Sequence, residues 1–199
     1  MYFSNCAKFD IMDLNGVIEV LGGDIYAKRA VDLLVKYCDI GIIPAKEIDD
    51  EELIMLLEYY KLALPFNSIN SSLSWNFRII LHENLEIPYI VRAFFKELKL
   101  KETNPEDVIV NYFKEIGERN PEEFVEIFRE LISYSKNCIV DGDRIVKVSS
   151  KYKRDGGVVI AELKGSGLIS PYIRIIRKLK SPLYELNRFF VKLLNSGTR

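Results

Sequence analysis

Apolar residues recur every three or four positions through most of the first 135 residues, the spacing of one helix face. We expect helices at residues 24–38, 51–64, 68–85, 89–100, 105–116 and 121–132, the first of them capped by Asp24. The last two of these helices are both preceded by Asn and begin with Pro-Glu, which places a capping asparagine before a proline at the first helical position. The pattern therefore predicts a body built from helices alone, with no strands before residue 136.

The pattern changes after Ser135. Two apolar stretches, at 138–140 and 144–148, flank Asp141-Gly142, a dipeptide typical of tight hairpin turns. The stretch 158–161 fits either a short strand or the start of a helix, while Ser170-Pro171 and Ser181-Pro182 are each expected to open a helix. The sequence thus predicts a mainly α protein, in which a helical, bundle-like body (1–135) precedes a small α/β module of β-hairpin and helices (136–199).

Charge divides the chain at the same place. Residues 1–135 carry 14 Lys and Arg against 24 Asp and Glu, a net charge of −10. Residues 136–199 carry 14 against 5, a net charge of +9. Such asymmetry favours contact between the basic segment and a polyanion, most often nucleic acid.

Six basic residues are the candidate nucleic-acid-binding residues. Three fall in one predicted turn, and three are spaced i, i+3 and i+4, which places them on one face of a predicted helix. An ordinary solvated surface explains the same pattern about equally well, and the contrast with the acidic body supports the functional interpretation. The six are Lys151, Lys153, Arg154, Arg174, Arg177 and Lys178.

The sequence supplies no recognisable catalytic or metal-binding set. Its three cysteines are widely spaced and its single histidine, His82, has no neighbouring ligand type, so we expect neither a metal nor another cofactor. Asp141 and Asp143 lack the remaining ligands of a calcium loop. No apolar run is long enough to span a membrane, and the odd cysteine count fits a reducing cytoplasm. The absence of glutamine resembles proteins from hot environments.

Four short motifs follow one another at residues 76–83 (NFRIILHE), 128–136 (FRELISYSK), 153–160 (KRDGGVVI) and 168–174 (LISPYIR). This succession, within residues 52–179, resembles the amino-terminal domain of the large subunit of archaeal and eukaryotic-type DNA primases. The resemblance implies a non-catalytic structural or regulatory subunit, which binds a catalytic primase-like subunit and helps to position nucleic acid. The family's paired arginines have no counterpart at 68–72, and its iron–sulfur cysteines are absent.

A second interpretation needs no partner subunit. The segment around residues 162–180, with a helix, a turn and a following basic helix, also resembles a winged-helix domain. The chain would then be a stand-alone regulator that binds DNA or RNA through its basic module.

Overall fold

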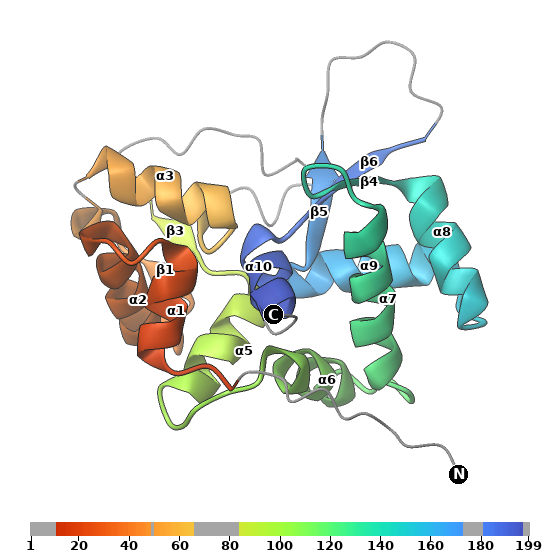
Figure 1. Cartoon of the computed structure of the whole chain (residues 1–199), viewed down its shortest axis with the longest axis horizontal. Helices are drawn as coiled ribbons and strands as arrows, with labels where there is room; N and C mark the ends of the chain where they lie inside the picture. The colour runs from red at the N-terminus through yellow and green to blue at the C-terminus, as the bar shows by residue number, and fades with distance from the viewer. Residues whose placement is uncertain (1–10, 49, 66–83, 173–180, 197–199) are drawn as a thin grey trace.

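The computed structural model describes residues 11–48, 50–65, 84–172 and 181–196 (Figure 1). These residues form mainly α-helices, together with two small antiparallel sheets of three strands each. The expected fold class, mainly α with a small α/β module, is confirmed.

Three helices form one side of the molecule, at the left in Figure 1: α1 (Leu14–Leu21), α2 (Ile25–Tyr37) and α3 (Glu51–Tyr60). Aspartates cap all three; Asp24, for example, accepts a hydrogen bond from the Ala27 backbone N–H at 2.8 Å, as the sequence predicted. Helix α1 was not among the expected helices. It is only eight residues long, too short for apolar spacing to reveal.

A small sheet joins these helices, and the prediction of a strand-free body is wrong. Strands β1 (Ile42–Ile43) and β2 (Leu64–Pro65) both pair antiparallel with β3 (Leu85–Glu86). Each strand has two residues, too few for a period-two pattern to be recognised. Their backbone groups pair because Ile43, Leu64 and Leu85 are fully buried, where an unpaired N–H or C=O is costly. The helix expected over 68–85 otherwise lies outside the described residues.

Three further helices continue the body: α5 (Tyr89–Leu98), α6 (Pro105–Glu115) and α7 (Glu122–Tyr134). The Asn104 side chain caps α6 as expected, accepting from the Glu106 N–H at 2.9 Å. The matching prediction for Asn120 is wrong, because helix α7 starts at Glu122 and the Asn120 side chain instead donates to Glu123.

The segment after α7 contains a second sheet and three helices. Their order is β4 (Ile139–Asp141), α8 (Gly142–Lys151), α9 (Gly156–Ser166), β5 (Ile169–Tyr172), β6 (Leu183–Leu186) and α10 (Arg188–Ser196). Strand β6 lies between the other two and runs antiparallel to both, which gives the sheet order β4-β6-β5.

Three local predictions in this segment are wrong. Asp141 does not turn a hairpin; its side chain caps α8 by accepting from the Arg144 N–H at 2.8 Å, so residues 144–148 are helical. Ser170-Pro171 lies inside strand β5, and Ser181-Pro182 precedes strand β6, with helix α10 starting only at Arg188. Of the two alternatives for residues 158–161, the helix is correct.

Helix α10 lies at the centre of the molecule, between α1–α3 and α7–α9 (Figure 1). Its Phe189 and Phe190 are fully buried and pack against Phe94 and Phe95 of α5, with ring centroids 5.3–5.9 Å apart. One hydrophobic core therefore includes side chains from both predicted segments, 1–135 and 136–199. The boundary between the two coincides with the end of α7.

Candidate nucleic-acid interface

Helices α8 and α9 form a helix–turn–helix unit, residues 142–166. The turn places Lys153 in the left-handed region at φ 58°, and Asp155 then caps α9 by accepting from the Val158 N–H at 2.9 Å. Gly156 lets the two helices approach closely, because a Cβ there would lie 2.7 Å from the Val146 Cα. The angle between the helices thus depends on a residue without a side chain.

Strands of the β4-β6-β5 sheet precede and follow this unit in the sequence. Strand β4 leads directly into α8, and β5 follows α9 after the left-handed Gly167. Strand β6 then returns between them, with Leu183 opposite both Asp141 of β4 and Tyr172 of β5. The resulting order is helix α7, strand, helix, turn, helix and a final pair of strands.

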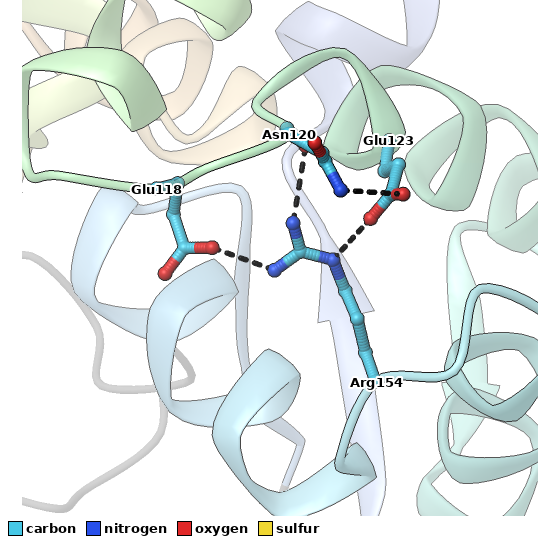
Figure 2. A network of polar contacts seen from close by, with 4 residues as sticks. All are labelled: Glu118, Asn120, Glu123 and Arg154. Carbon is cyan, nitrogen blue, oxygen red and sulfur yellow. Dashed lines mark hydrogen bonds and ion pairs between the residues drawn. The ribbon is translucent and has the colours of Figure 1, made fainter.

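Arg154 ties the turn of this unit to the loop between α6 and α7 (Figure 2). Its guanidinium donates from Nη1 to Glu118 and from Nε to Glu123, both at 2.6 Å, and from Nη2 to the Asn120 carbonyl at 3.1 Å. The same guanidinium lies 4.5 Å from the Phe124 ring centroid. These three hydrogen bonds and one ring contact fix the guanidinium in place, so Arg154 has a structural role. We call residues 118, 123 and 154 the Arg154 clasp.

A fourth ionisable group adjoins the clasp from α9. Burial, and next the neighbouring carboxyl group of Glu118, raise the pKa of Glu162 to about 7. The pKa of Glu118 is lowered, first by the hydrogen bond from Glu162 and then by Arg154. Oε2 of Glu162 is enclosed with no hydrogen-bond donor beside it. Near neutral pH the two carboxyl groups therefore differ in charge.

An open cleft of about 570 Å³ lies beside the clasp. It is polar, and it includes two cations, Arg119 and Lys153, for which no ion pair is found among the described residues. The residues that line it are Gly117, Glu118, Arg119, Asn120, Glu123, Tyr152, Lys153 and Arg154.

The three described members of the predicted basic set have different environments. Arg154 is held in its clasp, and the Lys151 ammonium pairs with Glu130 on α7. Only Lys153 is both exposed and unpaired within the described part of the chain. The other three, Arg174, Arg177 and Lys178, lie outside the described residues, in the connection between β5 and β6. Their role in nucleic-acid binding stays a prediction.

The exposed face of α9 was not predicted from the sequence. Gly157, Ala161, Lys164 and Gly165 are exposed and share one side of the helix. This face also includes the exposed Val158 and has a single cation, Lys164. It is not recognisable until residues 156–166 are known to be helical. The acidic partners of Arg154 were missed as well, because no sequence spacing links residues 118 and 123 to 154.

Within the described residues, neither a metal site nor a membrane-spanning helix is found. These residues contain no group of three or more His, Cys, Asp or Glu side chains arranged to hold a metal ion. Among their helices, none has the length and apolar character needed to cross a membrane.

Comparison with known proteins places the chain in a family. The model of one protein family, uncharacterised in function, matches residues 15–197. The chain belongs to that family. The match runs from α1 to the end of α10, so the helical body and the helix–turn–helix unit both lie within it. No curated protein and no solved structure matches the chain.

Proposed function

We propose that this protein binds nucleic acid through the helix–turn–helix unit and the sheet beside it. The observation that carries the proposal is the element order from α7 to β6, with sheet order β4-β6-β5. This order resembles that of a winged-helix domain, in which the second helix of the unit faces the nucleic acid and the final strand pair flanks it. The inference rests on analogy of fold, and charge supplies independent support.

The distribution of charge also favours nucleic-acid binding by residues 136–199. Residues 136–199 carry a net charge of +9 and residues 1–135 a net charge of −10. The connection between β5 and β6 contains Arg174, Arg177 and Lys178, and the turn and α9 contribute the exposed Lys153 and Lys164. Phosphates are attracted to such a segment and repelled by the acidic body, which orients the polyanion.

The exposed face of α9 favours contact with the backbone over reading of bases. Direct readout needs Asn, Gln, Arg or similar side chains that reach base edges. Gly157, Ala161 and Gly165 offer none, although their small size permits close approach of a sugar–phosphate chain. We therefore propose binding that depends weakly on sequence and strongly on salt.

A salt titration tests this proposal. Fluorescence anisotropy of labelled duplex and single-stranded DNA would be measured with wild type, the Lys153→Ala/Lys164→Ala variant and the Arg174→Ala/Arg177→Ala/Lys178→Ala variant. Each lost phosphate contact should reduce the slope of log K against log salt by roughly 0.7–0.9. The double variant should thus lose up to about 1.4–1.8 in slope on the nucleic acid that the protein prefers.

A charge-matched control separates contact from net charge. Lys28→Ala/Lys114→Ala removes two exposed lysines from α2 and α6, in the acidic body, and should leave the slope unchanged. Equal slopes for both double variants, or no binding at low salt, would refute nucleic-acid binding by this surface.

A second proposal retains the resemblance to the primase large subunit. A non-catalytic subunit of a primase-like complex needs a docking surface for its catalytic partner, and α3 exposes Met55 and Tyr59, 58% and 56% accessible. These side chains border an open cleft of about 270 Å³. The test is purification from native lysate. A stoichiometric protein partner, lost in Met55→Ser/Tyr59→Ser, supports the subunit role; nucleic acid alone supports the stand-alone regulator.

A further inference from the structure

The Arg154 clasp joins two segments that are distant in the sequence. Glu118 and Glu123 belong to the α6–α7 loop and the first turn of α7, whereas Arg154 belongs to the α8–α9 turn. Both ion pairs are largely shielded, with the Arg154 side chain 15% exposed. Whatever alters the charge of this cluster therefore alters how firmly the turn is attached to the body.

Glu162 is the carboxyl group beside this cluster that has a buried oxygen, Oε2, without a hydrogen-bond partner. The charged groups that face it are Glu118 from the α6–α7 loop and Arg154 from the α8–α9 turn. Glu123 of α7 holds the Nε side of the guanidinium, and Arg119 and Lys153 line the adjoining cleft. The described hydrogen bonds of Arg154 go to Glu118, Glu123 and the Asn120 carbonyl, and Oε2 of Glu162 is enclosed without a donor.

We propose that Glu162 operates the Arg154 clasp as a proton-dependent latch, which holds the α8–α9 turn against the α6–α7 loop while Glu162 is protonated and loosens when it ionises. In the protonated form, Glu162 can donate to the Glu118 carboxylate, and only two carboxylates then lie around the single guanidinium. Ionisation removes that donor and leaves three carboxylates around a single guanidinium. Adjacent like charges with burial oppose this state.

The direction of the pH effect follows from linkage. The folded-state pKa of Glu162, about 7, is above its ordinary value of 4.5. The native protein thus binds more protons than the unfolded chain between these values, and stability falls as pH rises through that window. The stabilisation is fully present below about pH 4.5 and is lost by the time pH passes about 7.

The latch is tested on the protein alone, without nucleic acid, so its failure and that of the proposed function are distinguishable. First, the side-chain carboxyl carbon of Glu162 is titrated by NMR. A midpoint near 7 is expected, and it should move toward 4.5 in Glu118→Gln. Second, exchange of the Arg154 backbone N–H, which donates to the Ser149 carbonyl, is measured between pH 6 and pH 8 and corrected for intrinsic rates.

In the wild type, protection of the Arg154 N–H against exchange should fall several-fold from pH 6 to pH 8. The Glu162→Gln variant mimics the protonated acid and cannot ionise, so it should keep its protection. Glu126→Gln is the matched control, because Glu126 is exposed on α7; it should respond to pH as wild type does. A Glu162 midpoint near 4.5, or equal loss of protection in wild type and Glu162→Gln, would overturn the latch.

Discussion

Replacing Asn187 with Ala should lower the free energy of unfolding more than replacing any exposed asparagine with Ala does. Asn187 is fully buried and uses both ends of its amide. Nδ2 donates to the carbonyls of Lys61 and Gly167, at 3.2 and 3.1 Å, and Oδ1 accepts from the N–H groups of Phe189 and Phe190. One side chain thereby joins the end of α3, the end of α9 and the start of α10.

The expected loss follows from these four bonds. Removing the helix cap costs about 1 kcal/mol. Leaving the two buried carbonyls without their donor costs about 1–3 kcal/mol each if no water replaces it. The sum is about 3–7 kcal/mol, a drop in Tm of roughly 6–28 °C for a domain of this size. The measurement is urea unfolding followed by far-UV circular dichroism, with thermal unfolding alongside.

Two further variants isolate the cause. Asn187→Ser keeps an oxygen that can cap α10 and loses only the donors, so it should recover about 1 kcal/mol relative to the alanine variant. Asn111→Ala removes an exposed asparagine whose amide donates to Glu97, and it should change stability by less than about 0.5 kcal/mol. A loss below about 1 kcal/mol in Asn187→Ala would refute the reasoning.

Two other substitution pairs test the packing directly. Gly156→Ala should cost about 1–3 kcal/mol in urea unfolding, because the new Cβ meets the Val146 backbone, whereas Gly165→Ala in the same helix meets nothing within 4 Å and should be neutral or stabilise by up to about 1 kcal/mol. Equal effects at these two positions would mean that close approach of α8 and α9 is unimportant. Lys61→Met should cost about 1–3 kcal/mol, because it leaves the buried Glu185 with Arg188 alone, whereas Lys36→Met breaks an exposed pair with Glu47 and should cost less than about 0.5 kcal/mol. A larger loss at Lys36 than at Lys61 would contradict the assignment of the buried pair.

The helices α2, α3, α5, α6 and α7 were predictable from the sequence. Helix formation depends on apolar spacing and on caps within a few residues, and both are local. Asp24 and Asn104 cap helices where expected, and Phe94 and Phe113 face the core as their spacing indicates. The charge division is also a property of sequence alone.

The candidate interface was predicted only in part. Lys153 is an exposed cation of the turn, as expected, but Arg154 and Lys151 have acidic partners from residues 118, 123 and 130. A count of basic residues cannot reveal this, since an ion pair between elements depends on how they pack. The cations near it, Lys164 and Arg119, became candidates only after α9 and the cleft were located.

The same reason explains the errors in local structure. Asp141-Gly142 suits a hairpin turn or a helix start about equally well by itself. The fold selects the helix because Ile145 and Val148 are buried at helical spacing, while β4 finds its partner in β6, more than 40 residues away. Sequence alone determined where helices can form and where charge gathers. Pairing between distant segments decided the strands, the Asn187 network and the Arg154 clasp, because those contacts exist only once the chain has packed.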